Sequence, residues 1–265
     1  MTTWVRLVAS ELLKVRSTRL WWGLLLGVVF MSAVQAGVTA GFAGADLGAG
    51  QGTAPGLDEP ETIRSVYATA AFAGAYVLAL VLGITGMTGE YRYQTATPTF
   101  LASPRRSRVV LAKSAAQLVF GLLYGVVALA TALLVGTAVI AIRGHDLGYG
   151  TPGLWRAAAL AVLAVGLWAM IGMGIGTLIR NQVAAIMVGV FVTFLLEPLL
   201  SLGLDALELG RVAQWLPTNA SSALTSPSET TIELLDWWAG GLVMAGYAVL
   251  FAALGVLLSV RRDVT

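Results

Sequence analysis

Apolar residues fall into six long stretches with short polar breaks between them. The stretches cover residues 20–42, 66–88, 109–142, 154–179, 183–203 and 237–260. A bilayer core of about 30 Å needs about 20 mostly apolar residues per helix, so each stretch is long enough to cross it. The composition agrees, since 57% of the 265 residues are hydrophobic and the mean hydropathy is +0.82. The pattern predicts an all-α integral membrane protein: one transmembrane domain over residues 1–265 with six transmembrane helices.

Charged residues are segregated between the two sides of these stretches. One side carries twelve of the sixteen basic residues: Arg6, Lys14, Arg16, Arg19, Arg92, Arg105, Arg106, Arg108, Lys113, Arg180, Arg261 and Arg262. Glu11, Glu90 and Asp263 are the acidic residues on that side. The other side carries ten of the fourteen acidic residues: Asp46, Asp58, Glu59, Glu61, Asp146, Asp205, Glu208, Glu229, Glu233 and Asp236. Basic flanks are retained in the cytoplasm, so we expect a multi-pass protein with both termini inside.

Residues 3–19 form an amphipathic stretch before the first span. Its apolar positions recur at helical spacing: Trp4, Val8, Leu12 and Val15. Its basic residues are Arg6, Lys14, Arg16 and Arg19. The stretch predicts a helix in the inner interface whose basic side chains reach anionic lipid head groups. The alternative is that the first span simply extends into the cytoplasm.

The cytoplasmic loop after the second span predicts a short helix over residues 95–103. Thr97 can cap that helix, Pro98 suits its first position, and Ser103-Pro104 ends it. Thr99, Phe100 and Leu101 lie on it, and the basic residues Arg105, Arg106 and Arg108 follow it. Two large apolar side chains on so short an element favour a docking surface. The alternative is that they fold back against the bilayer.

Polar residues inside the apolar stretches are few. Lys113, Gln117 and Tyr124 share one face of the third stretch, which at 1.5 Å per residue is too long for the hydrocarbon and must tilt or protrude. We expect Lys113 to snorkel to the interface, and we consider Gln117 and Tyr124 as lining residues. Glu197 lies within the fifth span, where a carboxylate must face the protein interior or a wet cavity. It is either a polar contact on a transport path or a hydrogen bond between helices.

Two further patterns concern the outer side and the packing of the helices. Residues 204–236 form an extracellular segment before the last span, with apolar positions that suggest partial re-entry into the outer interface. Small-residue pairs that allow close helix packing recur at four-residue spacing: Gly23/Gly27, Gly37/Gly41, Gly121/Gly125 and Gly172/Gly176.

Several kinds of chemistry lack the residues that they need. The two lysines, Lys14 and Lys113, do not follow the glycine pattern of a phosphate-binding loop, so no nucleotide site of that kind is expected. His145 is the single histidine and there are no cysteines, which argues against a metal centre and a thiol nucleophile. We expect no catalytic residues, no cofactor bound by the chain itself and no nucleic-acid partner.

The arrangement Glu90…Thr95…Ser103-Pro104…Arg108…Lys113, with Glu197-Pro198 and Leu216-Pro217 as weaker matches, resembles a known family. Together with the topology, it resembles the permease subunit of a type-2 ATP-binding-cassette (ABC) exporter, the small six-span bacterial kind. The resemblance covers the whole chain at the level of topology. It implies that residues 3–19 are a connecting elbow helix and that the 95–103 helix is a coupling helix.

The resemblance also implies the partners. Two copies of a separate ATPase subunit would hold ATP and Mg²⁺, and a second permease, identical or different, would complete the transport path in the bacterial cell membrane. Membrane lipids would surround the helices. The alternatives are a non-transporting scaffold or sensor subunit of a cell-envelope complex and, less favoured because Glu197 stands alone, an ion-coupled secondary transporter.

Overall fold

The computed structural model describes residues 3–46, 53–95, 106–225 and 234–261. Over these residues the chain is helical and contains no strand, apart from an isolated bridge between Asp46 and Thr53. The elements are α1 Thr3–Ser17, α2 Leu20–Phe42, α3 Pro60–Arg64, η1 Ser65–Thr69, α4 Ala70–Arg92, α6 Arg106–Ile142, α7 Leu154–Leu178, α8 Gln182–Phe191, η2 Val192–Leu196, α9 Glu197–Ala206, α10 Gly210–Ala213, α11 Pro217–Thr225 and α12 Trp237–Arg261.

The described residues contain six helices that are long and apolar enough to cross a membrane, which confirms the predicted number. Two of them are composite. The second runs from Pro60 to Arg92 through a π-helical turn, η1, and the fifth runs from Gln182 to Ala206 through another, η2. Such π-helical turns are commonly found as single insertions within α-helices.

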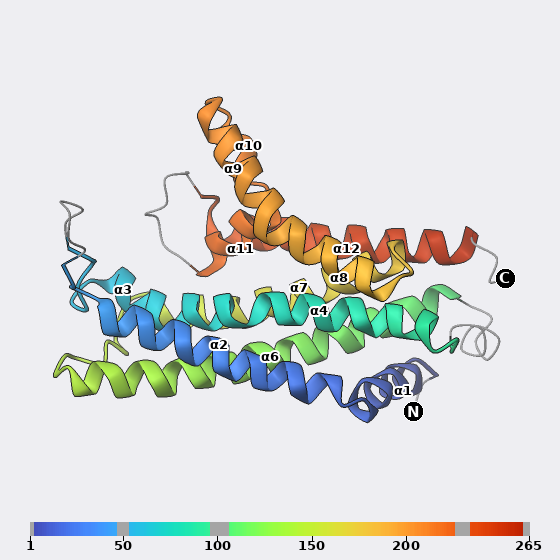
Figure 1. Cartoon of the computed structure of the whole chain (residues 1–265), viewed down its shortest axis with the longest axis horizontal. Helices are drawn as coiled ribbons and strands as arrows, with labels where there is room; N and C mark the ends of the chain where they lie inside the picture. Colours follow the sequence, from blue (N-terminus) through green and yellow to red (C-terminus); the bar gives the residue numbers. More distant parts are fainter. Residues whose placement is uncertain (1–2, 47–52, 96–105, 226–233, 262–265) are drawn as a thin grey trace.

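Helices α2, α4, α6, α7 and α12 lie side by side, and both chain ends lie at one end of the bundle (Figure 1). That end, here called the basic end, also holds α1, the end of α4 and the start of α6. The opposite end, here called the acidic end, holds α3, the end of α2 and the start of α12. α9 and α10 project away from the bundle.

The inner pair of helices is α4 and α7. In the apolar stretches of the second and fourth spans, which contain α4 and α7, 61% and 67% of residues are buried, against 22% for α2 and for the fifth span. Their backbones meet at glycines: a Cβ on Gly83 would lie 2.0 Å from the carbonyl oxygen of Ala169, and one on Gly172 would lie 2.1 Å from that of Leu80. Only glycine permits this approach.

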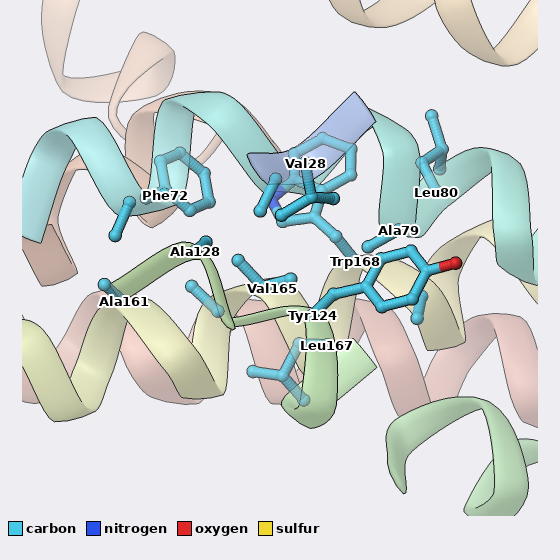
Figure 2. Packing of buried hydrophobic residues seen from close by; sticks show 14 of the residues in the cluster. Val28, Phe72, Ala79, Leu80, Tyr124, Ala128, Ala161, Val165, Leu167 and Trp168 are labelled. Carbon is cyan, nitrogen blue, oxygen red and sulfur yellow. The ribbon is translucent and has the colours of Figure 1, made fainter. Parts of the chain in front are cut away.

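Some of the predicted small-residue pairs pack closely against another helix, and others do not. Gly172 and Gly176 pack against the α4 backbone, and Gly121 and Gly125 pack against α7. Gly23, by contrast, has nothing within 4 Å of the position of a Cβ. Around these contacts lies an apolar core that includes Val28, Phe72, Leu80 and Trp168 (Figure 2). The spacing identified packing positions on α6 and α7 but not which spans they join.

Residues 3–17 form a helix of their own, because the chain bends at Thr18 and Arg19 before α2 begins. α1 packs against α6 through part of its apolar side, where Leu12 and Val15 contact the main core, while Trp4 is exposed. The short cytoplasmic helix predicted over 95–103, with Thr97, Pro98, Thr99, Phe100 and Leu101, lies outside the described residues except for Thr95, and so does Arg105.

Candidate functional site

Four charged side chains from three helices meet at the basic end. Glu11 and Lys14 come from α1, Glu90 from the last turn of α4, and Lys113 from the second turn of α6. They form a closed ring, here called the charge cluster. Lys14 Nζ donates to Glu11 Oε1 at 2.6 Å and to Glu90 Oε1 at 2.9 Å. Lys113 Nζ donates to Glu11 Oε2 and, at 2.9 Å, to Glu90 Oε1.

Three of the four side chains of the charge cluster are buried, and the cluster is electrically balanced. The side chains of Glu11, Glu90 and Lys113 are 5–6% exposed, while that of Lys14 is 43% exposed. Two carboxylates face two ammonium groups, so each charge has opposite charges beside it. Buried charges are tolerated only when they are paired in this way, and removing one partner is strongly destabilising.

Electrostatics in the cluster outweigh the cost of burial for both residues of α1. Burial by itself raises the pKa of Glu11, but Lys113 and Lys14 beside it bring that pKa below its ordinary value of 4.5. Burial by itself lowers the pKa of Lys14, but Glu11 and Glu90 bring it above its ordinary value of 10.5. Both residues are therefore charged across the physiological pH range.

The backbone carbonyl of Glu90 also takes part in the turn by which the chain leaves α4. Gln94 adopts a left-handed conformation with φ +55°, the amide of Thr95 donates to the carbonyl oxygen of Glu90, and the amide of Gln94 donates to that of Tyr91. These are the two hydrogen bonds of a Schellman motif, which ends a helix and redirects the chain. Through its carboxylate and its carbonyl, Glu90 connects the charge cluster to the first residue of the 95–103 segment.

Gln117, which the sequence suggested as a lining residue, lies next to the charge cluster in the contact between α4 and α6. It is buried, and a Cβ on Gly86 would lie 1.9 Å from its Nε2 atom, so the amide packs directly on the α4 backbone. Its Oε1 atom and the Oε2 atom of Glu90 are buried without a hydrogen-bond partner. Tyr124, two turns farther along α6, is also buried, and its hydroxyl donates to the carbonyl oxygen of Trp21. Both predicted lining residues thus lie in contacts between helices.

Glu197 forms a second polar contact, between α9 and α11. Its Oε2 atom accepts hydrogen bonds from the backbone amide of Thr218, at 2.9 Å, and from the Thr218 hydroxyl. One turn along α9, Ser201 accepts a hydrogen bond from the Asn219 side chain at 2.9 Å. Thr218 and Asn219 lie in the first turn of α11, where free amides and the helix dipole favour an anion.

The remaining predicted basic residues are dispersed. Arg6, Arg16 and Arg19 are exposed on or just after α1, and Arg108 is exposed on α6, whose first residue is Arg106.

Within the 204–236 segment, α11 packs against α7 and α12, and its Ser221 hydroxyl accepts a hydrogen bond from the Trp168 indole at 2.8 Å.

Sequence reasoning missed the charge cluster. It expected Lys113 to snorkel, whereas the residue is buried between Glu11 and Glu90. A signal was present, since these two carboxylates stand among twelve basic residues on the same side.

No model of a known protein family matches the chain, and no curated protein does either.

Proposed function

We propose that the chain is the permease subunit of an ATP-driven ABC exporter in a bacterial cell membrane, powered by two copies of a separate ATPase. In this proposal a second permease completes the transport path and both termini are cytoplasmic. Six apolar helices and the segregation of charge support the membrane part of the proposal. The family motif, which begins at Glu90 and ends at Lys113, supports the exporter part.

The charge cluster is the observation that carries the proposal. A permease without a nucleotide site must receive force from its ATPase through a mechanical contact. The segment after α4 is the proposed contact, with Phe100 and Leu101 as apolar anchors and Arg105, Arg106 and Arg108 facing acidic groups of the ATPase. The carbonyl of Glu90 accepts a hydrogen bond in the turn where that segment begins, and its carboxylate joins α4 to α1 and α6 by ion pairs. Movement of the segment would therefore move three helices together.

α1 has the role of the elbow helix in this proposal. It is a separate helix, packed on α6 and bonded to α4 and α6 through Lys14 and Glu11. A helix that only continued the first span would not make these contacts. The scaffold or sensor alternative requires no such connection between a cytoplasmic segment and several spans, because nothing has to be driven.

Affinity purification of the tagged chain from its native host tests the proposal. The expected result is a stoichiometric ATPase whose ATP hydrolysis changes when the permease is bound. The double substitution Phe100→Ala/Leu101→Ala should weaken this association, since burying one large apolar side chain is worth about 1.5–3 kcal/mol. The single substitution Arg108→Gln is the control, because an exposed ion pair contributes about 0.2–1 kcal/mol. Purification of the intact chain with no ATPase would contradict the proposal and favour a scaffold or sensor.

A further inference from the structure

An apolar cleft lies between α1 and α6, beside the charge cluster. Its volume is about 410 Å³, within the range of small-molecule sites. Leu12, Leu13 and Arg16 of α1 line one wall, and Val119, Phe120 and Leu123 of α6 line the other. Leu13, Val119 and Leu123 are 64%, 48% and 40% exposed, so the cleft opens at the surface of the bundle. One cation at the edge of an apolar cleft suits a ligand with an apolar tail and an anionic head.

Two tryptophans indicate the level of the cleft relative to the membrane. Trp21 and Trp22 begin the first span, and indole rings favour the membrane–water interface. The Trp21 ring lies 6.0 Å from the ring of Phe120, which lines the cleft, and its indole nitrogen donates to the carbonyl oxygen of Arg16 at 3.0 Å. The cleft is therefore level with the interface. Lys113 lies seven residues, or about 10 Å, farther toward the basic end.

Arg16 is the charge that remains available at this site. Both oxygens of Glu11, the acidic residue of α1, are occupied by Lys14 and Lys113, and Lys14 is itself bound to two carboxylates. In the described part of the chain no ion pair is found for Arg16, and its side chain is exposed at the rim of the cleft. Basic sites between membrane helices on the cytoplasmic side bind anionic lipid head groups.

We propose that this cleft is a binding site for one anionic glycerophospholipid, with an acyl chain between α1 and α6 and its phosphate on Arg16. The lipid would form part of the attachment of α1 to α6 at the level of the interface, complementing the charge cluster. The proposal concerns the chain alone and does not depend on its transport role. A zwitterionic lipid could place the same acyl chain in the cleft, but its cationic head would oppose Arg16.

Lipid titration of the purified, delipidated chain, followed by native mass spectrometry, tests the site. Dioleoyl phosphatidylglycerol should bind about fivefold more tightly than dioleoyl phosphatidylcholine, as expected for one arginine near an anionic head group. Arg16→Gln should abolish this preference. Arg6→Gln removes an exposed arginine ten residues earlier on α1 and should preserve it. Leu123→Trp should fill the cleft and weaken both lipids, whereas Leu134→Trp, at a 72% exposed position on α6, should weaken neither.

Three results would overturn the proposal: equal affinity of the wild-type chain for the two lipids, equal effects of Arg16→Gln and Arg6→Gln, or unchanged lipid binding by Leu123→Trp. If Leu123→Trp does not yield a monodisperse protein, the arginine pair decides the question, because both of its side chains are exposed.

Discussion

Two regions of the molecule stabilise buried carboxylates in different ways. At the basic end, Glu11 and Glu90 share two lysines, and the four groups connect α1, α4 and α6. Glu197 instead accepts hydrogen bonds from neutral donors of Thr218, at the start of α11. No ion pair of Glu197 is found in the described part of the chain.

This difference indicates different roles for the two sites. A balanced ring of ion pairs holds helices from separate parts of the chain in one arrangement, and breaking it at one member leaves a buried charge unpaired. A carboxylate at a helix start satisfies local amides and fixes one connection, here between α9 and α11. In the proposed exporter the basic end is where a force would spread to several helices, and we interpret the Glu197 contact as structural.

Loss of one lysine from the charge cluster should have the largest effect. Lys113→Met leaves two buried carboxylates with a single partner, Lys14, so we expect about 3–5 kcal/mol of destabilisation. Thermal or denaturant unfolding of the purified chain in detergent measures it. Arg108→Gln, an exposed charge on the same helix, should change stability by less than about 1 kcal/mol. Equal effects of the two substitutions would show that the cluster is not buried as described.

A smaller effect is expected at the other carboxylate. Glu197→Leu leaves the amide and hydroxyl of Thr218 without their acceptor, which should cost about 1–3 kcal/mol. Glu197→Gln retains an oxygen acceptor and should cost less. For the proposed exporter, the structural interpretation further predicts that Glu197→Gln leaves assembly with the ATPase, ATP hydrolysis and transport unchanged. Lost transport with normal assembly would instead place Glu197 on the transport path.

The attachment of α1 should not depend on pH in the physiological range. The pKa of Glu11 is below 4.5 in the folded chain, so its contribution is present above 4.5 and is lost as the pH falls through the lower, folded value. The pKa of Lys14 is above 10.5, so its contribution is full below 10.5 and is lost as the pH rises through the higher, folded value.

A spin label on a single cysteine at Ser10, an exposed position of α1, measures this dependence, and the chain has no cysteine of its own to interfere. Label mobility should stay constant between pH 4.5 and 10.5 and should increase only outside that window. A transition centred near neutral pH would show that another group controls the attachment of α1.

The fold was largely predictable because hydrophobic length and charge segregation are properties of single segments. The six spans and the separation of charge needed no knowledge of which helices touch. The charge cluster needed that knowledge, since its members are separated by up to 102 residues in sequence. Lys113 therefore looked like an interfacial lysine, although the unusual presence of Glu11 and Glu90 among basic residues indicated that it had partners.

The inward orientation of Glu197 was predictable because it depends on its own segment alone. A carboxylate inside an apolar span must find a polar partner, so its inward orientation followed from solvation alone. Its partner, Thr218, lies in the 204–236 segment, and the packing of α11 against α7 and α12 selects it. Apolar content suggested re-entry of that segment but could not specify which helix it would contact.

The central claim is that the charge cluster connects the proposed ATPase contact to the spans, and the double substitution Glu90→Gln/Lys113→Met tests it most directly. It removes one charge of each sign and the ion pairs that join α1 to α4 and α6, while the Glu11–Lys14 pair within α1 remains. Stability should recover most of what Lys113→Met loses, because the remaining charges balance. The measurement is the change in ATP hydrolysis that the chain causes in the ATPase proposed to bind it. We predict that the double variant binds the ATPase but no longer changes its hydrolysis rate; a wild-type change in that rate would contradict the claim.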